Sequence, residues 1–171
     1  MHMRTKGRID LGETELPRVE LRTEKEPVKG ISSYQAIPEL VEFMCLAPLT
    51  SGVHTLGLGR VAIILDEETG ELVGMKCFVK TGRWKTGEAP PQPDAEGALV
   101  VMYPGGDEEI AFIPAEPRFT WHEESCSLRI SFQGDTALVF KVADRLLAGV
   151  DRRGRLTDIW VLDLDLNASF R

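Results

Sequence analysis

The chain has 171 residues, of which 20 are Lys or Arg and 27 are Asp or Glu, so its formal net charge at pH 7 is −7. A hydrophobic fraction of 43% is typical of one soluble globular domain and excludes collagen-like, mucin-like and wholly disordered chains. The longest apolar runs fall far short of the ~20 residues that cross a bilayer, so the sequence predicts no membrane partner.

The surplus of negative charge argues against nucleic acid as a partner, because such binding draws most of its affinity from Lys and Arg side chains that neutralise phosphates. The cysteines, Cys45, Cys77 and Cys126, are widely spaced and odd in number, which indicates neither a disulfide framework nor a zinc-binding Cys pair. No apolar stretch typical of a signal peptide follows the first residues. We therefore expect reduced thiols in a cytoplasmic protein without a bound cofactor.

Residues 1–29 are rich in charge and contain few large apolar side chains, so we expect a charged N-terminal arm that does not order by itself. Within the arm, Val19 and Leu21 alternate with charged residues. This alternation predicts a short edge strand that pairs with a sheet or with a partner subunit. Residues 30–171 are expected to form a single β-rich domain.

One short helix is predicted over residues 38–46. Leu40, Met44 and Ala47 recur at i, i+4 and i+7, which is the spacing of one helical face. Pro38 suits the first turn of a helix, and Pro48 would end it. We expect this helix to cover an opening or an edge of the β structure.

The chain after Gly52 has the pattern of β structure. Short runs rich in Val, Ile, Phe and Leu alternate with turn signals that contain Gly, Asp and Pro. The fold class is therefore expected to be mainly β, or β-dominated α+β. We expect an antiparallel sandwich or a partly open barrel of roughly eight to ten strands, with the one short helix.

Two predicted hairpins, at residues 60–79 and 145–163, resemble each other. Each contains an arginine, an aspartate six positions later, a glycine and a leucine: Arg60, Asp66, Gly70 and Leu72 in the first, and Arg145, Asp151, Gly154 and Leu156 in the second. An internal duplication would produce this similarity and would imply two equivalent halves. Convergence explains it as well, because hairpin turns commonly contain Asp and Gly.

The segment 80–97 is the most unusual part of the sequence and the predicted ligand-binding site. Lys80, Arg83 and Lys85 surround Trp84, and a proline-rich stretch follows. Loops of this length without regular structure are uncommon in compact domains and are often functional. The three cations could hold an anion while Trp84 stacks on it or anchors an interface. Alternatively, the segment is a surface loop whose tryptophan folds back onto the domain.

A metal site is the second candidate. His54, His122 and Glu123, or the neighbouring Glu124, could surround one pocket as zinc ligands. However, neither His-x-His nor His-Glu-x-x-His spacing occurs, and a histidine beside solvated acids near a strand end is an ordinary surface feature. The sequence also lacks the Gly-x-Ser-x-Gly pattern of a serine nucleophile.

Because motifs for catalysis are missing, we expect binding rather than catalysis. The predicted function is that of a non-catalytic cytoplasmic β-rich domain that binds a partner protein or a small ligand. Self-association through the arm and through edge strands would give a homo-oligomer. The alternatives are a small metal-dependent hydrolase that uses His54, His122 and a neighbouring Glu, and a protein that contacts anions or nucleic acid through the 80–97 loop.

Overall fold

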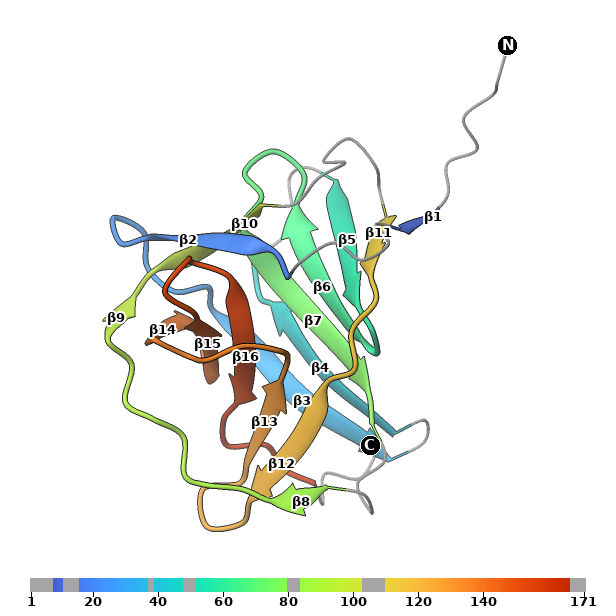
Figure 1. Cartoon of the computed structure of the whole chain (residues 1–171), viewed down its shortest axis with the longest axis vertical. Helices are drawn as coiled ribbons and strands as arrows, with labels where there is room; N and C mark the ends of the chain where they lie inside the picture. Colours follow the sequence, from blue (N-terminus) through green and yellow to red (C-terminus); the bar gives the residue numbers. More distant parts are fainter. Residues whose placement is uncertain are drawn as a thin grey trace.

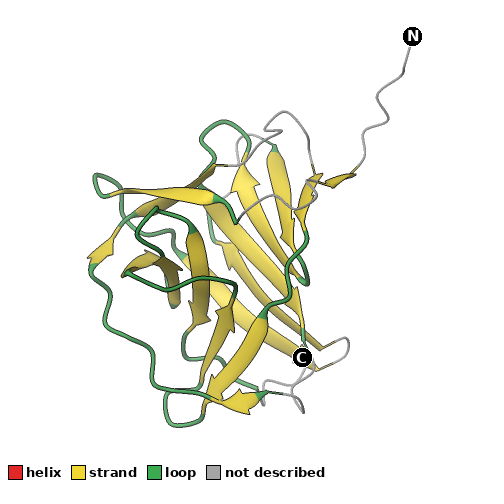
Figure 2. Ribbon diagram, in the orientation of Figure 1, coloured by secondary structure: helices red, strands yellow, loops and turns green. Residues whose placement is uncertain are grey.

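The structure is a computed structural model that describes residues 8–10, 16–36, 39–47, 52–79, 84–102 and 110–166. Within these ranges the chain forms sixteen strands and no helix (Figures 1 and 2). The strands are β1 (Arg8–Asp10), β2 (Arg18–Arg22), β3 (Gly30–Ala36), β4 (Glu39–Cys45), β5 (Val53–Leu58), β6 (Val61–Asp66), β7 (Leu72–Phe78), β8 (Lys85–Thr86), β9 (Ala95–Glu96), β10 (Ala98–Met102), β11 (Ile110–Ile113), β12 (Arg118–His122), β13 (Ser127–Ser131), β14 (Leu138–Ala143), β15 (Leu146–Val150) and β16 (Leu156–Val161).

The strands build two open seven-stranded sheets and one two-stranded ribbon. The first sheet has the order β1-β11-β5-β6-β7-β4-β3, and the second has the order β8-β12-β13-β16-β15-β14-β9. β2 and β10 pair antiparallel as the ribbon. One cluster of buried apolar side chains contains residues from both sheets and from the ribbon, so the sheets form a sandwich around a shared core. The predicted β-dominated, largely antiparallel fold is confirmed.

The helix predicted over residues 38–46 is wrong, because residues 39–45 form strand β4. Leu40 and Met44 are four positions apart, and an even spacing fits the period of a strand as well as that of a helix. Val41 and Phe43, on the opposite face of β4, are fully buried. β4 pairs with β3 on one side and with β7 on the other. β3 directly precedes β4 in the chain, whereas β7 is distant in sequence, so local periodicity could not reveal the second pairing.

The two sheets repeat one arrangement. The neighbouring strands β5-β6-β7-β4-β3 of the first sheet recur in the second as β14-β15-β16-β13-β12. The register repeats as well: the pair Val41 and Cys77 corresponds to the pair Leu128 and Val161. The similarity that the sequence shows in two hairpins therefore extends in the structure to five strands in each half.

The turns of the two hairpins share their hydrogen bonds. The carboxylate of Asp66 accepts two backbone N–H groups of its own turn, at 2.9 and 3.0 Å, and that of Asp151 does the same at 2.8 and 2.9 Å. Gly70 and Gly154 have φ angles of 73° and 77°. Because L side chains rarely adopt such angles, each turn requires its glycine.

The ribbon connects the two halves through these glycines. The backbone N–H of Val101, in β10, donates to the carbonyl of Gly70 at 3.0 Å. Correspondingly, the N–H of Val19, in β2, donates to the carbonyl of Gly154 at 2.8 Å. Val19 and Val101 are themselves paired across the ribbon, so one local two-fold relation describes both contacts.

The ribbon includes part of the predicted arm, residues 1–29. β2 shows the alternation noted in the sequence, and Val19 belongs to the buried core. β1 pairs in parallel with β11 at the edge of the first sheet. The division of the chain into an arm and a single domain stays a prediction.

The core position of β4 can be tested by truncating Phe43. Phe43→Ala should lower the free energy of unfolding by about 3–5 kcal/mol, because it leaves a cavity in a fully buried layer. Phe78→Ala is the matched control, since Phe78 lies on the neighbouring strand β7 with 57% of its surface exposed, and it should change stability by less than about 1 kcal/mol. Urea unfolding followed by circular dichroism measures both, and equal losses would contradict the assignment.

The Asp151 turn predicts a pH dependence of stability. The backbone N–H of Arg155, and then that of Arg153, hold the pKa of Asp151 below its usual range. A lowered pKa in the folded state means that the charge stabilises the fold above the unfolded pKa and that this contribution disappears as pH falls through the folded pKa. The stability difference between the wild type and Asp151→Asn should therefore narrow between about pH 5 and pH 2. Urea unfolding across this range measures it, and a constant difference would contradict the prediction.

Candidate functional site

The structure places the predicted 80–97 site only in part. Lys80 and Arg83 lie outside the described residues. Trp84 folds inward, packs against the core and lies with its ring centroid 5.4 Å from that of Trp121. Its indole nitrogen is buried and has no hydrogen-bond partner. Lys85 is exposed on β8, so Trp84 and Lys85 point away from each other rather than toward one ligand.

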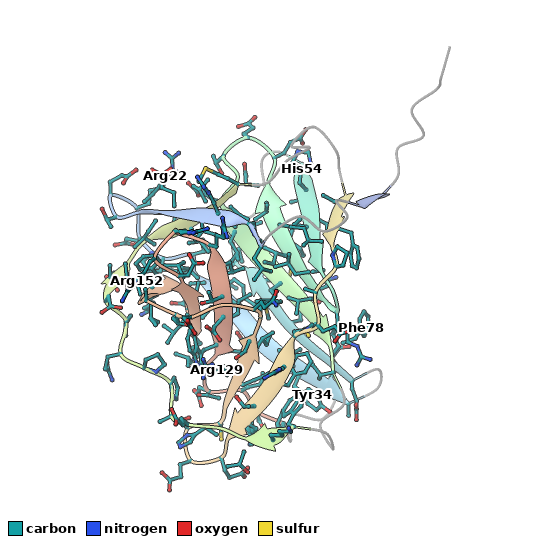
Figure 3. The ribbon with its side chains drawn as sticks, viewed as in Figure 1. Arg22, Tyr34, His54, Phe78, Arg129 and Arg152 are labelled. Atoms are coloured by element: carbon teal, nitrogen blue, oxygen red, sulfur yellow. The ribbon has the colours of Figure 1, made fainter. Side chains whose placement is uncertain are left out.

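The structure does not bring the predicted metal ligands together. His54 lies on β5 of the first sheet at the upper end of Figure 3, whereas β12, which His122 ends, runs to the lower end in Figure 1. The ring of His122 is hydrogen-bonded to the hydroxyl of Ser125 at 2.6 Å, and the Glu123 carboxylate accepts the indole N–H of Trp121 at 2.8 Å. In the part of the chain that the structure describes, no three His, Cys, Asp or Glu side chains are grouped to hold a metal ion.

A different site lies on the outer face of the second sheet. A half-open cavity of about 1080 Å³ is bounded there by the connection from β11 to β12 and by residues 132–134. We call it the outer cavity. Its polar floor comes from alternate positions of β12 and β13, namely Arg118, Thr120, Arg129 and Ser131. The residues between them point into the core, as the two-residue period of a strand requires.

Arg129 is the best-oriented charged group of the outer cavity. Its Nε atom donates to Oδ1 of Asp158 at 3.0 Å, and its guanidinium carbon lies 5.2 Å from the centroid of the Trp160 ring. The side chain of Arg129 is 38% exposed, whereas that of Asp158 is only 3% exposed. The bond through Nε uses one edge of the guanidinium and leaves its terminal nitrogens without a hydrogen bond among the described residues.

Asp158 is in turn held from its other side. Thr136 donates its hydroxyl hydrogen to the second carboxylate oxygen of Asp158. This close packing depends on Gly149 of the neighbouring strand, because a Cβ atom there would lie 2.9 Å from Thr136 and 3.1 Å from Trp160. A buried carboxylate thus supports an exposed arginine on strands that pair directly with each other.

Three cations, Arg118, Arg129 and Lys85, lie at or beside the outer cavity against two carboxylates, Glu116 and the buried Asp158, although the chain as a whole is acidic. Arg118 and Arg129 line it together with one carboxylate, that of Glu116. Lys85 is paired with Thr120 in the adjacent strand and therefore lies on the same face of the sheet. Apolar side chains complete the wall, chiefly Phe112 and Phe132.

The first sheet lacks this arrangement, although it repeats the same strands. By register, Glu42 occupies the position of Arg129, Lys76 that of Trp160, and Gly74 that of Asp158. Glu42 and Lys76 form an ion pair with a separation of 3.5 Å, and both side chains are partly exposed. The two halves are therefore alike in their core and different on their outer faces.

Sequence reasoning did not identify Arg129 and Asp158 as site residues. One signal was available: Asp158 is a charged residue in β16, which is buried throughout, and a charge within a buried strand requires a partner. The partner, Arg129, is 29 positions away, and only the pairing of β13 with β16 brings the two together.

Comparison with known proteins adds no assignment. No known protein family matches the chain, and no curated protein matches it. No helical segment of the described ranges has the length and apolar character of a membrane span. Any functional proposal therefore depends on the geometry of the outer cavity.

The support of Arg129 by Asp158 can be measured with a double-mutant cycle. The cycle compares Arg129→Ala, Asp158→Ala and the double variant, and it should give a coupling free energy of about 1–2 kcal/mol, because the charged hydrogen bond to a buried carboxylate is lost. The partial exposure of Arg129 keeps this value below that of a fully buried pair. The matched cycle on Glu42 and Lys76 should give less than about 1 kcal/mol, since that pair is longer and more exposed. Urea unfolding measures both cycles; equal couplings would contradict the special support of Arg129.

Proposed function

We propose that this chain is a binding domain that takes a small anionic ligand, carrying a carboxylate or a phosphate group, in the outer cavity. The observation that carries the proposal is the orientation of Arg129 by the buried carboxylate of Asp158 and the ring of Trp160. A cation held in this way loses little conformational freedom when a ligand binds, so more of the interaction energy appears as affinity.

The donors of the cavity support an anion with two or more oxygens. A guanidinium bound through Nε still offers N–H groups from its terminal nitrogens, in a planar arrangement that matches carboxylate and phosphate oxygens. Arg118 provides a second cation, and the hydroxyls of Thr120 and Ser131 provide further donors on the same floor. Two arginines suit one anionic group better than the row of phosphates in a nucleic acid.

The walls indicate the remainder of the ligand. Phe112 and Phe132 offer apolar surface on which an aliphatic or aromatic body would lose contact with water. Glu116 lies on the connection from β11 to β12 and would repel a second anionic group beside it. The preferred ligand therefore carries one anionic group at one end and an aliphatic or aromatic group at the other.

Phenyl phosphate, benzoate and inorganic phosphate are suitable probes, and NMR shifts of backbone and arginine Nε groups would report their binding. Phenyl phosphate should bind more tightly than inorganic phosphate because its ring adds apolar burial. Arg129→Gln should weaken phenyl phosphate binding by about tenfold or more, which corresponds to the loss of one charged hydrogen bond. Added salt should weaken binding further.

The repeated fold offers a matched control. Lys76→Gln removes one positive charge from the first sheet, at the position that corresponds to Trp160, and should leave phenyl phosphate binding unchanged. Circular dichroism would establish that each variant is folded. Failure of all three probes to give a saturable shift, or equal affinities of the wild type and Arg129→Gln, would refute the proposal.

A further inference from the structure

The two corresponding hairpin turns carry opposite charges. In the turn between β6 and β7, Asp66 is followed by Glu67 and Glu68, and both glutamate side chains are exposed. In the turn between β15 and β16, the corresponding positions are Arg152 and Arg153, which are exposed as well. We call these turns the acidic hairpin and the basic hairpin.

Both hairpins lie against the ribbon and are related by its local two-fold. The acidic hairpin binds β10 through the carbonyl of Gly70, and the basic hairpin binds β2 through that of Gly154. Figure 1 shows both turns at the end of the sandwich that the ribbon crosses, and Figure 3 shows Arg152 at the edge of this end. One end of the molecule therefore presents two similar loops of opposite charge on either side of the same ribbon.

From this geometry we infer that the chain associates with a second copy of itself, through a two-fold dimer in which the acidic hairpin of each copy meets the basic hairpin of the other. A two-fold axis perpendicular both to that of the ribbon and to the line that joins the two hairpins exchanges the two sides of this end. It therefore places Glu67 and Glu68 opposite Arg152 and Arg153 at two equivalent places. The same operation never places like hairpins together, so charge complementarity fixes the orientation.

The local charges favour these contacts. The backbones of Arg18 and Arg155 form an isolated antiparallel β-bridge beside the basic hairpin. These two arginines therefore add positive charge on that side of the ribbon. On the other side, Glu71 is already paired with Lys25, which leaves Glu67 and Glu68 as the carboxylates that a second copy would meet. Exposed ion pairs are individually weak and are screened by salt. The dimer should accordingly be weak, with an affinity that falls steeply as ionic strength rises.

Sedimentation velocity of the full chain at low and high ionic strength tests the inference. The wild type should form dimers at about 20 mM salt and dissociate at about 0.5 M, where the Debye length is only a few ångströms. Glu67→Arg with Glu68→Arg makes both hairpins basic, and Arg152→Glu with Arg153→Glu makes both acidic. Each double variant alone should raise the dissociation constant at least tenfold, because like charges then meet.

The decisive sample is an equimolar mixture of the two double variants. Every contact of the mixed dimer is complementary, so association should return in the mixture although each component alone is monomeric. The control for the Glu67 and Glu68 variant is Glu88→Arg with Glu124→Arg, which changes the net charge by the same amount and in the same direction at exposed positions outside both hairpins and should dimerise like the wild type. A wild type that is monomeric at low salt, dimers that persist in either double variant, or a mixture that stays monomeric would each overturn the inference.

Discussion

The structure depends on one physical constraint: each half of the chain makes a sheet with an apolar face that water must not reach. The inner face of the first sheet carries fully buried side chains such as Phe43 and Ile63, and that of the second carries Ile130 and Val161. Neither sheet has a helix to cover it among the described residues. The two inner faces cover each other, and hydrophobic burial between them provides the main driving force for the fold.

This constraint requires apolar residues on the inner face of each sheet, but it does not restrict the residues on the outer faces, which can differ between the two halves. Inward positions of corresponding strands are apolar in both halves, as Val41 and Leu128 illustrate. Outward positions differ in size and charge: Glu42 stands where the other half has Arg129, and Glu67 stands where it has Arg152. A fold with repeated cores can thus carry a cationic cavity on one sheet only, and opposite charges on its two hairpins.

The ribbon is the second element on which this arrangement depends. Its backbone N–H groups bind the glycine carbonyls of both hairpin turns, and its side chains, including Val19, enter the shared core. A strand near the start of the chain therefore joins a strand from its middle and contacts both halves. The orientation of the hairpins, and with it the position of their charges, follows from these backbone contacts rather than from the charged residues themselves.

Much of the strand pattern could be predicted from the sequence, and the long-range contacts could not. The runs of Val, Ile and Leu around Asp66 and Asp151, together with their glycines, indicated two similar hairpins, because turn chemistry is local. The segment of β4 was wrongly predicted as a helix. The spacing of Leu40 and Met44 fits the periods of both a helix and a strand, and only the pairing with β3 and β7 decides between them. The short strands β8 and β9 exist only as parallel pairings with distant edges, which explains part of the difference between the sixteen strands found and the eight to ten expected.

The candidate site shows the same division. The unusual composition of residues 80–97 predicted that Trp84 would contact a ligand. In the structure its ring packs against the core instead, which is a tertiary effect that the local sequence does not show. Asp158 is a charge in a buried strand, but its own segment does not show which residue it pairs with, and Arg129 forms a site with it only because β13 pairs with β16. By itself the sequence determined the β class, the hairpin turns and the surplus of negative charge, since these follow from local chemistry and composition. The tertiary structure alone decided which residues share a face and which charges gather, because these properties arise from the pairing of strands far apart in the chain.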